Sequence, residues 1–470
     1  MSVSKEDINL IVNEVLKAIG GTTTSGDRCG SALRQKGIFG GIEDAIKAAK
    51  DAQRKLVELP LKIRAKMIEN MRRRALEKVN ELARLAVEET GYGRVEDKVQ
   101  KNTLAITKTP GLEDLQPVSY SGDHGLTVVE QAPYGVIGAI TPSTNPSETV
   151  ICNSIGIIAA GNSVVFGPHP AAARVSQLAV AILNEAVVEA GGPENLMVSI
   201  AKPTVETAQT LMTHPDIRLL VVTGGPAVVA AAQKSGKKYI AAGPGNPPVV
   251  VDETADLKKA ARDIISGATL DNNILCIAEK EIIVIDSVAD ELKKHLRACG
   301  AYEASQREII QLEKTCLDPV THGPNRKLIG KNAAVILDTV GVRVPDEIRM
   351  VLCETTPDHP FVLEEMLMPV VPLVRVRDIH AAVDLAVKVE HGYHHTAVMH
   401  SKNIDNLHMM AIKCNCSIFV KNGPSYAGLG LGGEGFTTFT IASPTGEGLT
   451  SARTFTRQRR CVIVDYFRIV

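Results

Sequence analysis

Tryptophan is absent from the 470-residue chain, and aromatic residues make up only 3% of it. So few rings do not form the stacking surface that single-stranded nucleic acid needs. An excess of one charge is also missing, because 52 Lys and Arg residues face 53 Asp and Glu residues. A nearly neutral chain lacks the basic field that holds nucleic acid or an anionic membrane. We therefore expect neither partner.

Long apolar runs and regular cysteine spacings are lacking as well. No apolar run of about 18 residues stands out, so we expect no membrane span. Residues 1–20 mix acidic with apolar residues, unlike a secretory signal. The nine cysteines are irregularly spaced, which disfavours a secreted disulfide framework. The sequence therefore favours reduced thiols in the cytoplasm.

The N-terminal segment has a pattern of its own. In KEDINLIVNEVLKAI (5–19), apolar residues recur at helical spacing and predict an amphipathic helix within residues 1–20. Residues 21–36 begin rich in Gly, Thr and Ser and predict a linker. A tethered amphipathic helix favours docking on a partner protein, and the alternative is a helix packed on its own domain.

Strands and helices alternate through the rest of the chain, after a helix-rich region at 41–107. The predicted strands are 126–140, 163–167, 219–223, 248–252 and 281–286. The predicted helices between them are 171–190, 227–235, 255–268 and one beginning at 287. Apolar strands that alternate with helices indicate an α/β protein with parallel sheets. A chain of this length is expected to hold roughly two to four domains.

Four polar segments are candidates for ligand contact, because ligands of α/β sheets bind where strands end. They are 142–146, 223–226, 243–248 and 271–276, each expected at a strand end. Ordinary turns are the alternative for the three segments rich in Gly and Pro. A histidine cluster also occurs in EHGYHH (390–395), where we expect loop or core histidines rather than a metal site.

Longer segments resemble the aldehyde dehydrogenase superfamily, specifically its coenzyme A-acylating branch found in bacterial microcompartments. The resemblance is carried by PYGVIGAITPSTNPSET (133–149), AAGPGNPPVVVDETADL (241–257), DNNILCIAEKE (271–281), HPFVLEEMLMPVVPLVRV (359–376) and the glycine-rich segment 421–460. These segments follow the order of the family along the chain.

The resemblance implies an aldehyde dehydrogenase-like division of the chain. A Rossmann-type nucleotide-binding domain would comprise residues 37–115 and 135–242, and an α/β catalytic domain would comprise 243–439. A small β oligomerisation hairpin at 116–134, joined by 440–470, would pair copies into dimers or tetramers. An exposed apolar edge such as LTVVEQA (126–132) would otherwise be an aggregation hazard.

The resemblance also implies a reaction in which an aldehyde, NAD and coenzyme A give an acyl-coenzyme A and NADH. Cys276 matches the family nucleophile, and a thiolate is both a strong nucleophile and a good leaving group. Asn145 matches the side chain that, together with the backbone N–H of Cys276, stabilises the developing oxyanion. A turn asparagine before Pro146 is the alternative for Asn145.

Several further residues match the cofactor site of the family. Glu365 matches a glutamate that holds the nicotinamide ribose, and His169 is a candidate for lining the adenine pocket. The remaining cofactor candidates lie at the strand ends and are Thr141, Pro142, Ser143, Thr223, Gly224, Gly225 and Gly243. Many relatives have a lysine at the position of Gly167, and its absence favours NAD over NADP.

The most informative departure is a missing carboxylate. Hydrolytic relatives begin the glycine segment with a glutamate that activates water, and Ala241 stands at that position here. Water is a poor nucleophile without a general base, whereas a thiol is a good one, so transfer to coenzyme A is favoured over hydrolysis. A hydrolytic enzyme giving the free acid is the alternative, with Glu279 or Glu365 as the base.

The N-terminal helix resembles an encapsulation peptide for a microcompartment shell. The expected substrate is then propionaldehyde or acetaldehyde, which differ by one methylene, worth only ~1–3 kcal/mol in an apolar pocket. A third possibility is a catalytically silent scaffold inside the shell. The set formed by Cys276, Asn145 and Glu365 argues against a silent protein.

Overall fold

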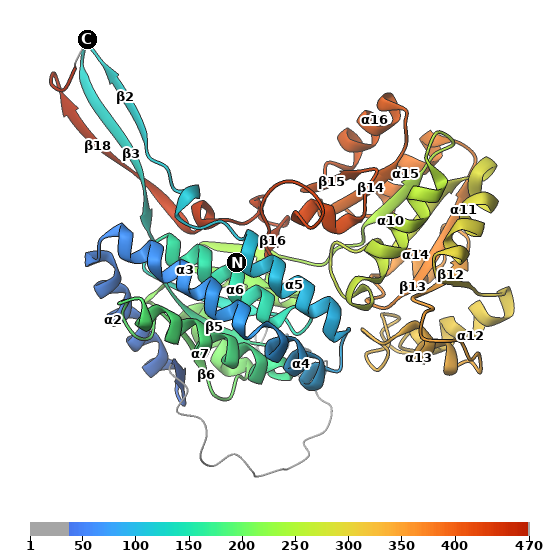
Figure 1. Cartoon of the computed structure of the whole chain (residues 1–470), viewed down its shortest axis with the longest axis horizontal. Coiled ribbons are helices and arrows are strands. Elements are labelled where there is room, and N and C mark those ends of the chain that lie inside the picture. The colour runs from blue at the N-terminus through green and yellow to red at the C-terminus, as the bar shows by residue number, and fades with distance from the viewer. Residues whose placement is uncertain (1–36, 469–470) are drawn as a thin grey trace.

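The computed structural model describes residues 37–468, so the predicted N-terminal helix and linker lie outside the described residues. The described chain forms two parallel sheets covered by helices and a long antiparallel arm (Figure 1). The predicted α/β class with parallel sheets is confirmed. The arm projects from the body that contains the first sheet.

The first sheet has six parallel strands in the order β1-β6-β5-β4-β7-β8. They are β1 (Ile38–Phe39), β4 (Val136–Thr141), β5 (Ser163–Pro168), β6 (Met197–Ile200), β7 (Ile217–Thr223) and β8 (Tyr239–Ala242). Strands β4 and β5 are buried along their whole length. Burial on both faces explains why such strands are continuously apolar in sequence.

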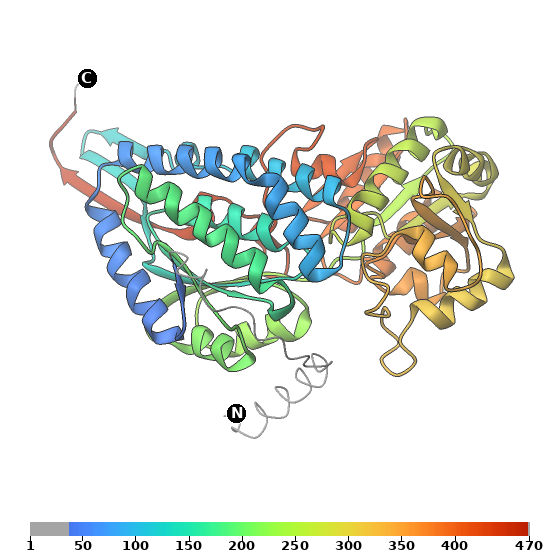
Figure 2. The ribbon, with the colours of Figure 1, turned by 60° about the horizontal axis from the view of Figure 1, so that its bottom comes forward.

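Helices cover both faces of this sheet (Figure 2). One face packs against α6 (Pro146–Ala159) and α7 (Ala173–Glu189), and α3 (Leu61–Glu77), α4 (Val79–Thr90) and α5 (Val95–Lys108) pack in turn on these two helices. The other face packs against α2 (Ile42–Glu58), α8 (Val205–Thr213) and α9 (Pro226–Lys234). The predicted helices at 171–190 and 227–235 are α7 and α9, each within two residues of the expected bounds.

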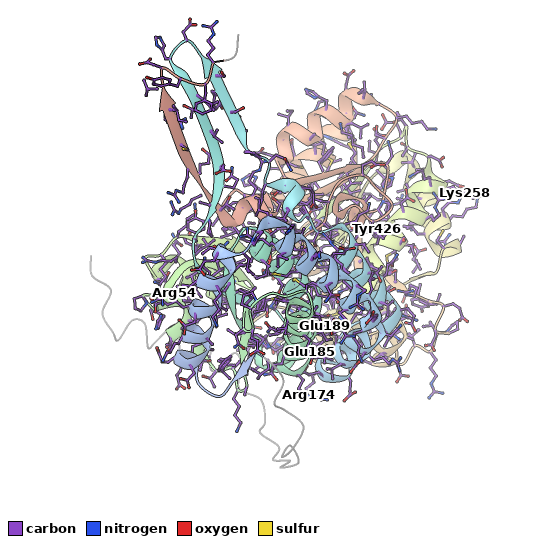
Figure 3. All side chains as sticks on the ribbon, turned by 60° about the vertical axis from the view of Figure 1, so that its left-hand side comes forward. Arg54, Arg174, Glu185, Glu189, Lys258 and Tyr426 are labelled. Carbon is purple, nitrogen blue, oxygen red and sulfur yellow. The ribbon has the colours of Figure 1, made fainter. Side chains whose placement is uncertain are left out.

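One helical stretch departs from the expectation that no long apolar run exists. Pro170–Glu189 is long and apolar enough to cross a membrane by length and composition. However, 67% of its apolar window is buried inside the protein. Glu185 and Glu189 lie on its exposed face (Figure 3). They pair with Arg74 and Arg73 of α3 at 3.7 Å and 3.2 Å. The run therefore has the apolar composition of a core helix with a charged outer face.

The second sheet has seven parallel strands in the order β11-β12-β13-β10-β9-β14-β15. They are β9 (Pro248–Val251), β10 (Glu281–Ile285), β11 (Ala301–Glu303), β12 (Met350–Glu354), β13 (Val370–Val376), β14 (Thr396–His400) and β15 (Ile418–Lys421). The accompanying helices are α10 (Leu257–Thr269), α11 (Asp286–Ala298), α12 (Gln306–Cys316), α13 (Ala333–Asp338), α14 (Pro360–Leu363), α15 (Ile379–Val389) and α16 (Ile404–Cys414).

The arm is a three-stranded antiparallel sheet in the order β18-β3-β2. It comprises β2 (Val118–Gly122), β3 (Gly125–Pro133) and β18 (Thr456–Val464). The segment before β18 does not join it, because η5 (Ala452–Phe455) packs against α6 with Ala452 and Phe455 buried. The β-rich run at 126–140 is also divided, and β3 and β4 belong to different sheets.

Candidate active site

The carboxyl ends of four neighbouring strands of the first sheet form one edge. Register places Thr141 of β4 beside Pro168 of β5, and Thr223 of β7 beside Ala242 of β8. From β4 the chain winds outward through β5 and β6, whereas β7 and β8 lie on the other side. Ligands of open α/β sheets bind outside such a switch point. The fold thereby brings together segments about 80 residues apart in sequence.

The turn after β7 has the features that a pyrophosphate requires. Gly225 is the N-cap of α9 and supplies no side-chain cap, so the positive end of the helix remains available to an anion. A Cβ at Gly225 would meet nothing within 4 Å. The neighbouring Thr223 Oγ1 lies 3.0 Å from Thr440 Oγ1. These residues fit the phosphates of NAD.

The end of β5 explains the glycine found where many relatives have lysine. A Cβ on Gly167 would lie 2.9 Å from Ile140 Cδ1 and 3.3 Å from Leu211 Cδ2. Two residues later, His169 Nδ1 accepts a hydrogen bond of 3.1 Å from the N–H of Ala171. Burial lowers the pKa of His169, and the charge of Arg326 lowers it further. His169 therefore presents a neutral, oriented ring, which suits contact with adenine.

The nucleophile candidate lies on a distorted loop. Segment 271–276 was expected at a strand end, but it follows helix α10 through η3 (Leu270–Asn273). Asp271, Asn272 and Asn273 all have positive φ, at 52°, 55° and 65°. The left-handed region costs L-residues roughly 1–2 kcal/mol each, and asparagine and aspartate tolerate it best. A run of three such residues persists only where surrounding contacts hold it.

Those contacts come from buried side chains on both sides of the loop. Asn272 Nδ2 donates to Gly330 O at 2.9 Å. Asn273 Nδ2 donates to Ala268 O at 2.7 Å. The ammonium of Lys280 closes the loop by donating to Asn273 O and Oδ1, both at 2.7 Å, and to Leu275 O at 3.1 Å. The loop therefore holds the backbone of Cys276 in one position.

A buried charge cluster joins this loop to Asn145. The Nζ atoms of Lys98 and Lys101, both on α5, lie 2.9 Å and 2.6 Å from Asp271 Oδ2. Lys101 Nζ also donates to Asn145 Oδ1 at 2.6 Å and lies 3.3 Å from Glu148 Oε1. Burial opposes the charge on Asp271, but the two ammonium groups outweigh it and lower its pKa. The cluster is balanced, with two cations and two anions.

Cys276 is partly exposed, and its environment favours the neutral thiol. Burial raises the pKa of Cys276 to about 12, and the carboxylate of Glu365 adds to the increase, while Lys280 and Lys101 act against it. Burial also raises the pKa of Glu365 to about 7. The carboxyl group of Glu365 therefore titrates near neutral pH, and its charge influences the pKa of the Cys276 thiol.

Close packing accounts for the glycine at position 245. A Cβ on Gly245 would lie 2.6 Å from Cys276 O and 3.0 Å from His395 Cγ. Burial lowers the pKa of His395 to about 4, so this ring is neutral. A side chain at position 245 would therefore not fit without a rearrangement of the Cys276 backbone.

The carboxylate missing from the sequence is not replaced by Glu279. Ala241 lies inside β8 and is fully buried. Glu279 is also buried, and its two oxygens accept hydrogen bonds from the N–H and Oγ of Ser425, at 2.8 Å and 2.7 Å. Because both carboxylate oxygens of Glu279 already accept hydrogen bonds, this side chain is poorly placed to activate water.

Sequence reasoning missed the charged residues that hold the site. Lys98, Lys101 and Lys280 are buried, and all three contact the loop. A signal was present, since Lys98, Lys101 and Asn102 share helical spacing with the buried Leu104 and Ala105 of α5. Polar residues at core positions of a helix require buried partners.

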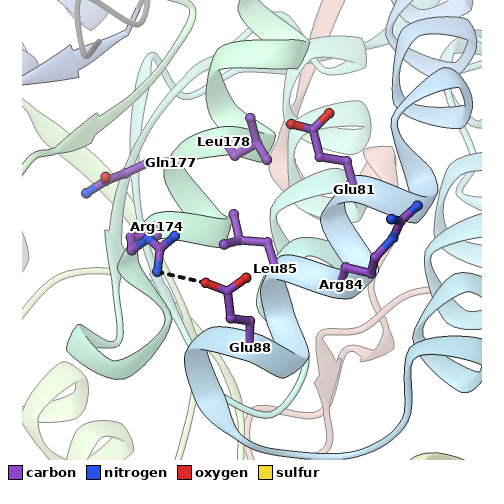
Figure 4. A pocket seen from close by; sticks show the side chains of 7 residues that line it. All are labelled: Glu81, Arg84, Leu85, Glu88, Arg174, Gln177 and Leu178. Atoms are coloured by element: carbon purple, nitrogen blue, oxygen red, sulfur yellow. Dashed lines mark ion pairs between the residues drawn. The ribbon is translucent and has the colours of Figure 1, made fainter. Parts of the chain in front are cut away.

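A surface cavity lies apart from these residues, between α4 and α7 (Figure 4). Its volume is about 510 Å³, and it is lined by Glu81, Arg84, Leu85, Glu88, Arg174, Gln177 and Leu178. None of the predicted site residues lines it. Within residues 37–468, no group of three or more His, Cys, Asp and Glu residues could hold a metal ion.

Comparison with known proteins places this geometry in a family. The model of the aldehyde dehydrogenase family matches residues 40–326. The chain is 52% identical to the acetaldehyde dehydrogenase (acetylating) EutE of Escherichia coli, over 100% of both chains.

Two solved structures are similar to the described fold. One is Rhodopseudomonas palustris propionaldehyde dehydrogenase with bound CoA and an acylated cysteine, with 51% identity and a TM-score of 0.90 over 91% of this chain and 98% of that one. The other is a propionaldehyde dehydrogenase from the Clostridium phytofermentans fucose utilisation bacterial microcompartment, with 50% identity and a TM-score of 0.91 over 93% and 100% of the chains. The chain belongs to the aldehyde dehydrogenase family, in its acylating branch.

Proposed function

We propose that this protein oxidises acetaldehyde or propionaldehyde with NAD and transfers the acyl group to coenzyme A. The observation that carries the proposal is the arrangement of Cys276 on a braced loop linked by buried charges to Asn145. The relatives named above act on these two aldehydes, and one of them holds CoA beside an acylated cysteine.

The reaction begins at Cys276 Sγ, which releases its proton to solvent and attacks the aldehyde carbon. The Nδ2 of Asn145 and the N–H of Cys276 donate to the oxygen as it becomes negative. NAD would supply the acceptor for the hydride that leaves this carbon. Cys276 then carries a thioester, and Glu365 holds the nicotinamide ribose.

Release of the acyl group needs a nucleophile that requires no strong base. The thiol of coenzyme A attacks the thioester carbon, and Cys276 leaves as a thiolate that takes up the proton lost by the coenzyme A thiol. The step is reversible, because one thioester replaces another and the free energy of the thioester bond is retained. Ala241 and Glu279 supply no base for water, and Glu365 is assigned to the nicotinamide ribose, which favours acyl transfer over hydrolysis.

The cofactor and the thiol substrate use the edge formed by β4, β5, β7 and β8. Thr141, Pro142 and Ser143 follow or end β4, Thr223, Gly224 and Gly225 follow or end β7, and Gly243 follows β8. This edge would hold the nucleotide parts of NAD and coenzyme A in turn, and His169 would line the adenine pocket. Position 167 is crowded and holds a glycine. No lysine is therefore present there to bind a 2′-phosphate, which favours NAD over NADP.

Assembly is part of the proposal. Copies of the chain pair through β2, β3 and β18 into dimers or tetramers, and residues 1–20 direct the enzyme to a microcompartment shell. A related enzyme comes from a bacterial microcompartment. Deletion of residues 1–20 should release the enzyme from purified compartments without lowering its specific activity. Undiminished co-purification with shells would rule out this role.

The activity itself is tested by NADH formation from propionaldehyde or acetaldehyde, with and without coenzyme A, and identification of the product. We expect strict dependence on coenzyme A and an acyl-coenzyme A product. Equal rates without it, with free acid formed, would establish the hydrolytic alternative.

Cys276→Ala should abolish turnover while the protein still folds, and turnover by this variant would remove Cys276 as the nucleophile.

A further inference from the structure

Two lysines of α5 share one carboxylate, but only one of them touches the proposed oxyanion residue. Lys98 and Lys101 are both buried and both pair with Asp271 Oδ2. Lys101 Nζ also donates to Asn145 Oδ1 at 2.6 Å. Lys98 Nζ instead has Thr144 O at 3.4 Å as its second contact. The chain therefore contains two lysines that share the contact with Asp271, and Lys101 adds contacts with Asn145 and Glu148 where Lys98 contacts Thr144 O.

The contact with Lys101 determines which end of the Asn145 amide is free. An asparagine side chain has an accepting oxygen and a donating nitrogen. The ammonium of Lys101 has only donors, so a reversed amide would place donor against donor. With Oδ1 bound to Lys101, Nδ2 has a single weak side-chain contact, to Thr144 Oγ1 at 3.3 Å. Nδ2 is therefore the end available to a substrate oxygen.

Lys101 is held in place by all its donors. Its three N–H groups meet Asp271, Asn145 and Glu148, and its side chain is only 1% exposed. A cation that bonds to an amide oxygen also polarises the amide and strengthens its N–H groups as donors, most of all away from water.

We propose that Lys101 is a positioning residue for aldehyde oxidation, which fixes the Asn145 amide with Nδ2 toward the reacting oxygen and strengthens it as a donor. The proposal rests on the oxyanion role proposed for Asn145. It assigns to Lys101 a function that Lys98 does not share, although both stabilise the Asp271 loop.

The test compares Lys101→Met with Lys98→Met, each alone and combined with Asn145→Ala. Both lysine variants lose one cation beside Asp271, so both should lower the melting temperature. Removing an oxyanion donor costs about 10²–10³ in kcat, and we expect Lys101→Met to lose at least about tenfold more kcat than Lys98→Met. In the Asn145→Ala background, Lys101→Met should cost little further kcat, because its effect passes through Asn145.

Alkylation of Cys276 by iodoacetamide supplies a second readout, since it needs no oxyanion donor. Lys101→Met should retain much more of its alkylation rate than of its kcat. If Lys101→Met fails to fold, the charge-balanced variant Lys101→Met/Glu148→Gln replaces it, with Glu148→Gln as control.

The outcomes separate this inference from the proposed function. Equal losses of kcat in Lys101→Met and Lys98→Met, or additive losses with Asn145→Ala, would overturn the role of Lys101. Full activity of Asn145→Ala would instead overturn the oxyanion role, and with it the basis of the inference.

Discussion

The side chain of Cys276 is a thiol at neutral pH, because burial and the charge of Glu365 both oppose the thiolate and raise its pKa. The cations Lys280 and Lys101 act in the opposite direction. Reactivity at the level of single residues is therefore set by a balance of nearby charges in a site from which water is partly excluded. The sequence identifies the thiol, but its pKa depends on groups up to 175 positions away.

Glu365→Gln should make Cys276 more reactive toward iodoacetamide while lowering turnover with NAD. Loss of the carboxylate charge lowers the pKa of Cys276, so the thiolate fraction and the alkylation rate at pH 8 increase severalfold. Since burial places the pKa of Glu365 at about 7, the difference from wild type should shrink below pH 6, where this carboxyl group is protonated. Glu364→Gln, at the exposed neighbour, serves as control. Slower alkylation of Glu365→Gln at pH 8 would contradict the electrostatic argument.

Buried histidines should make the fold sensitive to acid. Burial lowers the pKa of His400 to about 4 from 6.5. Below pH 6.5 the unfolded chain binds a proton that the native His400 does not, so stability decreases as pH falls. At pH 4 the loss is about 3 kcal/mol for this residue. Chemical denaturation between pH 7 and 4 measures the slope, which should be smaller in His400→Gln. An unchanged slope would show that His400 is not responsible.

The loop from Asp271 to Cys276 is an element that ordinary helix and strand rules do not describe. Its three left-handed residues are held by α5, by the loop after α12 and by Lys280 at the start of β10. Gly93 and Arg94, just before α5, also contact Asp271, and the N–H of Arg94 donates to Asp271 Oδ1 at 2.9 Å. The loop is held both by α5, which packs with the first sheet, and by residues that pack with the second sheet. A movement of α5 should therefore shift the position of Cys276.

Gly93→Ala tests this coupling. Gly93 has φ of +74°, and a Cβ there would lie 1.8 Å from Asp271 Oδ1. Gly191→Ala is the control, since its φ is +85° and a Cβ would meet nothing within 4 Å. The control should lose about 1 kcal/mol of stability from backbone strain alone. Gly93→Ala should be less stable than the control and should lose kcat, measured by coenzyme A-dependent NADH formation. Equal kcat in the two variants would refute the coupling.

At the scale of the whole molecule, the arm has outer edges that pair with no other strand of residues 37–468. Both outer strands of the arm, β2 and β18, have an open edge. Large apolar side chains are exposed on it, with Tyr120, Val462 and Val464 each more than half exposed. Open apolar edges of this kind are an aggregation hazard unless another chain covers them.

Val462→Lys/Val464→Lys should therefore reduce the assembled mass, measured by light scattering after gel filtration. Charges on an edge strand oppose pairing with a second strand and should leave the two helix-covered sheets folded. Arg460→Lys on the same strand is the control and should keep the native mass. A double-lysine variant with unchanged mass would exclude β18 from the interface.

The fold class and several of the helices and strands follow from the sequence, because apolar periodicity depends on neighbours along the chain. Examples are the strands at 163–167 and 219–223 and the helix at 171–190, which lie within two residues of the predicted bounds. The placement of 271–276 at a strand end was wrong, because left-handed conformations in three successive residues depend on distant contacts. The apolar length of Pro170–Glu189 likewise reflects the layers that bury it.

By itself, the sequence determined the chemistry available to this protein: Cys276 as a thiol in its family context, Asn145 as an amide, and alanine in place of a water-activating glutamate at 241. These residue types can be read directly from the sequence. Only the tertiary structure decided how these groups are held and charged, through Lys98, Lys101 and Lys280. The physical reason is that burial and Coulomb interaction depend on distance in space, and folding brings α5 to a loop about 170 residues further along the chain.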